Sequence, residues 1–179
     1  MKVNPDEGYF IRPLTGADCA QLGVFYRSLS QAITRFFRPF AEINDETMQN
    51  HLDHARSEKH ISLGLADKMG RIYGHAFVLS TDAPRPTFGI GLRDGLQGRG
   101  WGRRLMQAVL DDADSRGLPL VALTVVKNNE QAKSLYLKMG FVVRGETTFR
   151  EENDSFYMER VAPPISPPAP RPLPSSKAP

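Results

Sequence analysis

Residues 96–117, LQGRGWGRRLMQAVLDDADSRG, read as a glycine-rich turn that runs directly into an amphipathic helix. Gly98, Gly100 and Gly102 alternate along the turn, and their missing Cβ atoms let backbone N–H groups approach a ligand closely. Those groups begin the helix, where unpaired donors and the positive end of the dipole favour an anion. Three arginines crowd the same end: Arg99, Arg103 and Arg104. The stretch predicts an anion-binding helix start, while a plain tight turn with solvent-facing arginines stays open.

Two strand-like segments flank this turn and helix. Residues 87–93, TFGIGLR, lead into the turn, and residues 120–126, LVALTVV, form a continuous apolar run of strand length. Such a run is typical of a strand that is buried on both faces. Strand, helix and strand in this order predict a right-handed parallel crossover. The helix should bury a stripe of apolar residues: Leu105, Met106, Val109, Leu110 and Ala113.

The chain before this crossover reads as a strand, two helices and a hairpin. Residues 10–13 look like a short strand, and the helix that follows should end by Arg38, because Pro39 disfavours helical geometry in the residue before it. Alternation over residues 60–80 then predicts the hairpin. Candidate caps are Thr15 or Asp18 for the first helix and Asn44 or Asp45 for the second, which ends near Ser57.

The chain after the crossover reads as a helix and a closing antiparallel pair of strands. Asn128 or Asn129 can cap the helix, and Gly140 ends it at the position that glycine favours. Residues 141–147 and 155–161 look like the two strands of the pair.

The composition changes sharply at residue 162. Residues 162–179 hold eight of the fourteen prolines, and a segment of this kind cannot form a packed core. We expect one domain over residues 1–161, followed by a disordered proline-rich tail. The PxxP spacings of the tail leave open a role as a ligand for an SH3-like groove.

Length, charge and cysteine content exclude several classes of protein. The length of 179 residues suits one well-buried domain, and the formal charge of +3 includes Arg171 and Lys177 of the tail, so no general nucleic-acid surface is implied. Cys19 is the only cysteine, which excludes an internal disulfide and a cysteine-rich zinc site. The histidines at positions 51, 54, 60 and 75 lack the spacing of metal ligands. No apolar run reaches membrane-spanning length and the first residues lack the apolar core of a signal peptide, so we expect a cytoplasmic protein without a metal or membrane partner.

Two common phosphate-binding motifs do not fit the glycine turn. A P-loop needs Gly-x-x-x-x-Gly-Lys-Ser/Thr, and no lysine followed by a hydroxyl residue occurs near the turn. The dinucleotide fingerprint Gly-x-Gly-x-x-Gly fails because Arg103 occupies the place of its third glycine. The sequence therefore argues against nucleotide hydrolysis and against a dinucleotide site.

The turn instead resembles a motif of the GCN5-related N-acetyltransferase (GNAT) family. Residues 97–102, QGRGWG, are similar to its Gln/Arg-x-x-Gly-x-Gly/Ala signature, and residues 129–141, NEQAKSLYLKMGF, resemble its second block, Asn-x-x-Ala-x-x-Leu-Tyr-x-x-x-Gly-Phe. The order of elements matches over about residues 9–161. The resemblance implies an α/β fold whose mixed central sheet has about six or seven strands, splayed between two central strands and flanked by about four helices.

The same resemblance implies acetyl-CoA, or another acyl-CoA, as the donor. The backbone amides of residues 98–103 would hold its pyrophosphate, and residues 90–92 would pair with the amide-rich pantetheine arm as with an added strand. Asn129 would bond the arm, cap its helix, or do both. The implied cofactor-binding residues are Ile90, Gly91, Leu92, Gly98, Arg99, Gly100, Trp101, Gly102, Arg103 and Asn129.

For catalysis, the resemblance makes Tyr136 the general acid that protonates the departing CoA thiolate. Thr124 stands where some relatives place a glutamate base, and threonine is not a credible base. Deprotonation of the acceptor is therefore left to ordered water or to His75, Asp82 or Glu146. The implied reaction is acetyl transfer to a primary amine of a small molecule or protein. A catalytically silent acyl-CoA-binding or protein-interaction module is the alternative, and a homodimer is left open.

The resemblance also implies that the acceptor binds between the first two helices and the loop that joins the last two strands. That loop region is acidic and could attract a cationic amine, although a solvated hairpin tip explains it equally well. Its carboxylates are Glu146, Glu151, Glu152 and Asp154.

Overall fold

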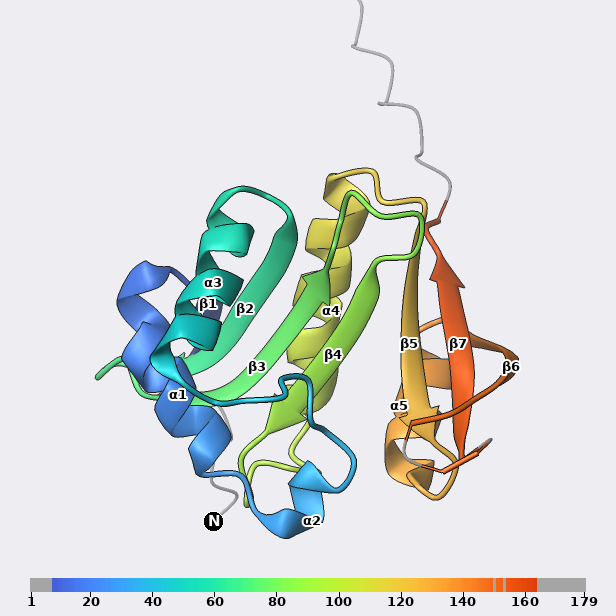
Figure 1. The fold of residues 1–179 in the computed structure, drawn as a ribbon, viewed down its shortest axis with the longest axis horizontal. Coiled ribbons are helices and arrows are strands. Elements are labelled where there is room, and N and C mark those ends of the chain that lie inside the picture. The colour runs from blue at the N-terminus through green and yellow to red at the C-terminus, as the bar shows by residue number, and fades with distance from the viewer. Residues whose placement is uncertain (1–7, 150, 153, 164–179) are drawn as a thin grey trace, which may run out of the picture.

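The computed structural model describes residues 8–149, 151–152 and 154–163, and one mixed sheet of seven strands runs through this part of the chain in the order β1-β2-β3-β4-β5-β7-β6 (Figure 1). The strands are β1 (Tyr9–Pro13), β2 (His60–Asp67), β3 (Ile72–Leu79), β4 (Thr87–Leu92), β5 (Leu120–Val126), β6 (Val142–Thr147) and β7 (Ser155–Val161). The helices are the short 3₁₀ helix η1 (Gly16–Asp18), α1 (Cys19–Arg27), α2 (Gln31–Thr34), α3 (Asp45–Arg56), α4 (Trp101–Ser115) and α5 (Glu130–Lys138). The expected α/β fold with a mixed central sheet is confirmed.

The sheet opens between its two central strands. β4 and β5 run parallel, as the crossover predicted, but only Thr87 and Ala122 are in register between them. Beyond this pair the strands diverge toward their C-terminal ends (Figure 1). β4 stays paired with β3 as far as Leu92, so its other edge carries unpaired backbone groups along residues 88–92. This open edge is the expected splay.

The helices cover both faces of the sheet. α4 packs against β2 and β3 on one face, while α1 and α3 pack against the same strands on the other (Figure 1). The predicted apolar stripe of α4 is fully buried, which removes it from water and stabilises the crossover. On β5, however, Thr124 is exposed, so burial on both faces was wrong at this residue. At this residue β4 has diverged from β5, whereas β7 still pairs with it on the other side through Tyr157.

The first predicted helix is broken, which is why five α-helices are present among the described residues rather than about four. α1 ends at Arg27, where the Ser28 hydroxyl donates to the Phe25 carbonyl at 2.7 Å. Ser30 is extended, and its hydroxyl donates to Asp94 at 2.8 Å before α2 begins. Serine side chains that bond elsewhere compete with helical geometry. The expectation of one continuous helix was therefore wrong, although both helices do end before Arg38.

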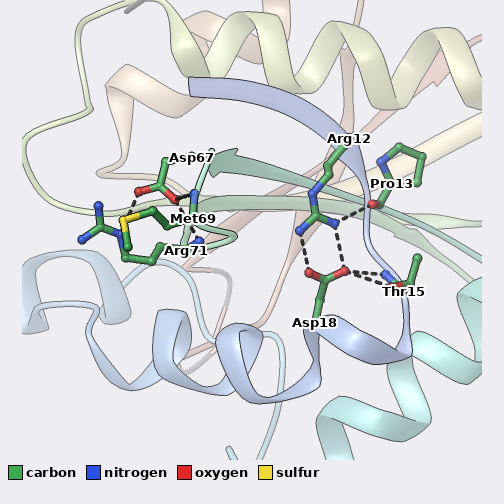
Figure 2. A network of polar contacts seen from close by, with 7 residues as sticks. All are labelled: Arg12, Pro13, Thr15, Asp18, Asp67, Met69 and Arg71. Atoms are coloured by element: carbon green, nitrogen blue, oxygen red, sulfur yellow. Dashed lines mark hydrogen bonds and ion pairs between the residues drawn. The ribbon is translucent and has the colours of Figure 1, made fainter. Parts of the chain in front are cut away.

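Two partly buried carboxylates make networks of local polar contacts in the N-terminal half (Figure 2). Asp18 accepts two hydrogen bonds from the Arg12 guanidinium, at 2.6 and 2.9 Å, and one from the Thr15 backbone N–H at 2.8 Å. The bonds from Arg12 lower the pKa of Asp18. Asp67 accepts from Arg71 and from the Met69 N–H, which closes the β2–β3 turn. Both carboxylates therefore have structural partners.

The remaining elements agree with the sequence. Asn44 caps α3 by accepting from the Thr47 N–H at 2.8 Å. The closing pair is antiparallel, and β7 lies between β5 and β6. Of the expected proline-rich tail, residues 164–179 lie outside the described residues. Within the described ranges, no helix is long and apolar enough to span a membrane.

Candidate functional site

The glycine turn joins the open edge of β4 to the start of α4. Gly98 and Gly100 have φ angles of 73° and 83°, which L-residues with a side chain rarely adopt. A Cβ atom on either glycine would meet no heavy atom within 4 Å, so the space beside them is open. The turn therefore presents bare backbone toward open space at the beginning of a helix.

The start of α4 presents unpaired N–H groups. The Arg104 N–H bonds the carbonyl of Gly100 at 3.1 Å, but no described residue accepts from the N–H groups of Trp101, Gly102 or Arg103. Gly100 is the N-cap residue and, having no side chain, offers these N–H groups no capping hydrogen bond. Three free donors on a helix of 15 residues make a site for an anion.

Charged side chains lie beside these donors. Arg99 and Arg103 are exposed, and neither forms an ion pair within the described part of the chain. The Arg104 guanidinium lies 5.0 Å from the centre of the Trp101 ring. The Trp101 side chain is buried against Tyr9, with ring centres 5.9 Å apart. Only the backbone of Trp101 is therefore left to contact a ligand.

Gly102 brings the donor elements close together. A Cβ at this position would lie 3.4 Å from Leu92 Cδ1 on β4 and 3.9 Å from Leu135 Cδ2 on α5. The end of β4, the start of α4 and the face of α5 thus meet around one residue. This arrangement places the expected pyrophosphate and pantetheine positions next to each other, at the C-terminal end of the splay.

Asn129 and Tyr136 lie on the far side of this splay. The Asn129 side chain caps α5 by accepting from the Ala132 N–H at 3.3 Å, which is the helix-capping role expected of it. Tyr136 is 9% exposed, and its ring lies near those of Phe88 and Phe141. Burial raises the pKa of Tyr136 to about 12. Its hydroxyl has no hydrogen-bond partner among the described residues, so it is available to a ligand.

The candidate bases differ in position. His75 is fully buried, and burial lowers its pKa well below the ordinary value. Asp82 lies in the β3–β4 loop, at the opposite end of β4 from Leu92, because Leu79 pairs with Thr87. Glu146 is at the correct end of the sheet but pairs with Lys127 at 2.7 Å. The structure therefore brings none of the three into the splay as a free base.

A buried polar chain was missed by the sequence reasoning. The Tyr26 hydroxyl lies 2.7 Å from His75 Nδ1, and His75 Nε2 lies 2.9 Å from the Ser62 hydroxyl. That hydroxyl is also 3.0 Å from His51 Nε2. The available signal was the presence of Ser62 and His75 inside otherwise apolar strands, but their partners on α1 and α3 are distant in sequence.

A hollow of about 430 Å³ lies between α1, α2 and the segment that leads to α3, near where the resemblance led us to expect the acceptor. Tyr26, Phe37 and Phe40 form aromatic walls. The Phe37 ring occupies the space in which a Cβ of Gly91 would stand, so the hollow adjoins the open half of β4. The hollow and the open edge of β4 thus meet at Gly91.

Fewer carboxylates of the acidic loop are available to bind a cationic amine than its composition indicated. Asp154 accepts from the backbone N–H groups of Phe149 and Glu151, at 2.8 and 3.1 Å, so it shapes the loop. Glu146 is paired with Lys127. Glu151 and Glu152 remain exposed. Among the residues that the structure describes, no group of three or more His, Cys, Asp or Glu is arranged to hold a metal ion.

The chain belongs to the acetyltransferase (GNAT) family, whose model matches residues 26–141. This match includes the open edge of β4, the glycine turn and α5. The resemblance drawn from the two motifs is thereby confirmed at the level of the family.

Solved structures of similar fold agree with this assignment. A GNAT acetyltransferase from Streptococcus pneumoniae is 22% identical with a TM-score of 0.72, covering 87% of this chain and 99% of that one. Ribosomal-protein-S5-alanine acetyltransferase from Vibrio fischeri is 15% identical with a TM-score of 0.75, covering 90% and 97%. Spermidine N-acetyltransferase from Vibrio cholerae, solved with CoA and spermine, is 19% identical with a TM-score of 0.68, covering 87% and 96%. At these identities the likeness establishes the shared fold.

Proposed function

We propose that the chain is an N-acetyltransferase that moves the acetyl group of acetyl-CoA to a primary amine. The observation that carries the proposal is the juxtaposition at Gly102 of three unpaired N–H groups and the open edge of β4. A CoA pyrophosphate matches the former, and an amide-rich pantetheine arm matches the latter. The V. cholerae protein of similar fold was solved with CoA, which supports the same ligand for this chain.

Arg99 and Arg103 would add charge-assisted contacts to the phosphates, since both are exposed beside the three donors. Ile90 and Leu92 would extend the sheet by bonding the pantetheine amides along their free edge. Asn129, on the other side of the splay, caps α5 through its side-chain oxygen, and its side-chain NH₂ would bond the arm. The thioester would then lie near Gly91, where the donor and acceptor sides adjoin.

The chemical step is direct attack. The neutral amine nitrogen attacks the thioester carbonyl carbon, so a C–N bond forms and the C–S bond breaks. The sulfur leaves with the bonding electron pair, and the thiolate takes the phenolic proton of Tyr136. A buried phenol with a pKa near 12 is fully protonated at neutral pH, as a general acid must be. The proton lost by the amine passes to water, and solvent then reprotonates Tyr136.

A catalytically silent acyl-CoA-binding module is the second candidate. It is favoured by one observation, which is that Thr124 stands exposed in the splay where some relatives carry a glutamate. The two candidates share the donor site and differ only in turnover.

The test measures free thiol release from acetyl-CoA across a panel of small amines and peptides, with mass spectrometry of the products. An acetylated amine formed in proportion to thiol supports the transferase. Acetyl-CoA binding without product from any amine would identify the silent module instead. If acetyl-CoA neither binds nor reacts, both candidates are wrong.

A further inference from the structure

We infer that the hollow beside Tyr26 selects acceptors that carry a carboxylate next to an aromatic or apolar group, in addition to the amine that is acetylated. This inference rests on the proposed function and names the acceptor class of the same site. It differs from the expectation, drawn from the acidic loop, that the acceptor is purely cationic.

The position of the hollow makes it the acceptor site. Phe37 forms part of its wall and packs directly on Gly91 of β4, next to the proposed thioester position. Ser30, at the start of α2, donates its hydroxyl proton to Asp94 in the β4–α4 loop at 2.8 Å. This bond holds the wall of the hollow against the segment that leads into the glycine turn. An acceptor bound here is therefore adjacent to the donor.

All of the charged residues that line the hollow are positive. Arg27, Arg35 and Arg38 belong to its lining, which contains no aspartate or glutamate. None of the three arginines forms an ion pair with a described residue. The carboxylate next along the chain, Glu42, lies outside the lining and accepts a hydrogen bond from the Asn44 side chain at 3.1 Å. Three cations around one hollow attract an anionic group and repel a polyamine.

The walls are aromatic and preformed. Tyr26 stacks near Phe37, with ring centres 6.0 Å apart, and meets Phe40 edge-on at 5.1 Å. The bond of 2.7 Å from the Tyr26 hydroxyl to His75 fixes the ring in place. Because Tyr26 is buried and its pKa is raised, it adds no negative charge. The walls therefore suit a flat or apolar group, while the arginines suit its carboxylate.

The first experiment compares kcat/KM for acceptors that differ in one group. Phenylalanine and aromatic dipeptides are measured against their C-terminal amides, against 2-phenylethylamine, against the phosphonate analogue of phenylalanine, and against spermidine. We expect each carboxylate to exceed its amide by about tenfold or more, which is the usual effect of one charge-assisted contact. Equal rates for acid and amide, or preference for spermidine or the phosphonate, would overturn the inference while leaving the transferase intact.

The second experiment reverses charge in the hollow with the double variant Arg35→Glu/Arg38→Glu. Both side chains are exposed, so the fold should survive, and a melting curve verifies this. KM for the carboxylate acceptor should rise by about tenfold or more, with KM for acetyl-CoA unchanged. Lys68→Glu, in the distant β2–β3 turn, is the control, because it also replaces an exposed cation with a glutamate. It should leave KM for the acceptor and KM for acetyl-CoA unchanged. An unaltered acceptor KM in the double variant contradicts the inference, and lack of turnover with every acceptor overturns it together with the proposed function.

Discussion

Two buried tyrosines near the splay show how local partners separate chemical roles. Burial raises the pKa of both Tyr26 and Tyr136. The Tyr26 hydroxyl is held by His75 at 2.7 Å, whereas the Tyr136 hydroxyl has no partner among the described residues. Tyr26 is thus a fixed wall, and Tyr136 is the phenol that remains able to donate to a ligand. Tyr136 would supply the proton to CoA.

The variant Tyr136→Phe tests this role. We expect kcat to fall by about a hundredfold or more, which is the usual effect of losing a general acid, while KM for acetyl-CoA stays the same. The wild-type kcat should also not decrease through deprotonation of Tyr136 between pH 8 and about 10, because the pKa of Tyr136 is near 12. A stopped assay of thiol release at saturating acetyl-CoA measures both the kcat of the variant and the pH dependence of the wild-type kcat.

The matched control is Tyr73→Phe, which removes a phenol that bonds Asp67 at 3.2 Å in the β2–β3 hairpin. It should leave kcat unchanged. A Tyr136→Phe enzyme with wild-type kcat would show that the thiolate is protonated by another group.

At the scale of single residues, the sequence was informative where a role depends on local backbone. Gly98, Gly100 and Asn129 act through the turn or cap in which they stand, so their spacing alone predicted their places. The pairing of Tyr26 with His75 joins residues 49 positions apart, and no local pattern encodes it. Thr124 was expected to be buried because it lies in a continuous apolar run. The splay beside it depends on the arrangement of the whole sheet, which no local pattern encodes.

Among the elements, α1, α3, β2 and β3 are joined by the buried chain from Tyr26 to His51. Burial lowers the pKa of His51 to about 3, with smaller contributions from His60 and His54, and lowers that of His75 well below its ordinary value. Both imidazoles are therefore neutral in the folded protein at neutral pH. In the unfolded chain, each takes up a proton below about pH 6.5.

This difference predicts acid sensitivity of the fold. Because the unfolded state binds more protons below about pH 6.5, the free energy of unfolding decreases as the pH falls from there toward 3. Between pH 7.5 and 5.5, the two histidines should reduce it by about 2–3 kcal/mol. Urea unfolding at the two pH values measures the change.

The variant His51→Gln should lose about half of this pH dependence, whatever its stability at pH 7.5, since it removes one of the two buried imidazoles. Equal unfolding free energies for the wild-type protein at pH 7.5 and 5.5 would mean that the histidines are protonated in the folded state.

The elements themselves were predictable to the extent that their ends are set locally. α3, α4 and α5 begin and end near the expected caps and glycines. The break between α1 and α2 was not predictable, because Ser30 leaves the helix for Asp94, a residue 64 positions away in the chain. That break forms part of the wall of the hollow that we propose as the acceptor site, so the missed feature would also bear on specificity.

For the molecule as a whole, we propose that the domain ends at residue 161 and that residues 162–179 are accessory. β7 ends at Val161, and the Ala162 N–H donates to the Pro119 carbonyl at 3.0 Å. Truncation after residue 163 keeps this last bond and should change neither the melting temperature nor kcat/KM. Circular dichroism melting curves and the thiol-release assay compare the full chain with the truncated one. A lower melting temperature or a lower kcat/KM after truncation would show that the tail takes part in the fold or in the reaction.

We propose that the glycine turn and the open edge of β4 together hold acetyl-CoA. Two glycines permit a matched test, because Gly100 and Gly70 have φ angles of 83° and 78° and each faces open space, but Gly70 lies in the distant β2–β3 turn. Alanine at either position should cost a similar amount of stability, about 1 kcal/mol.

The decisive measurement is the dissociation constant of acetyl-CoA, determined by isothermal titration calorimetry for the wild type, Gly100→Ala and Gly70→Ala. We expect binding that is weakened by about tenfold or more in Gly100→Ala alone, since the added Cβ would project toward the pyrophosphate. Equal affinity in all three proteins, or no binding by the wild type, would contradict this proposal.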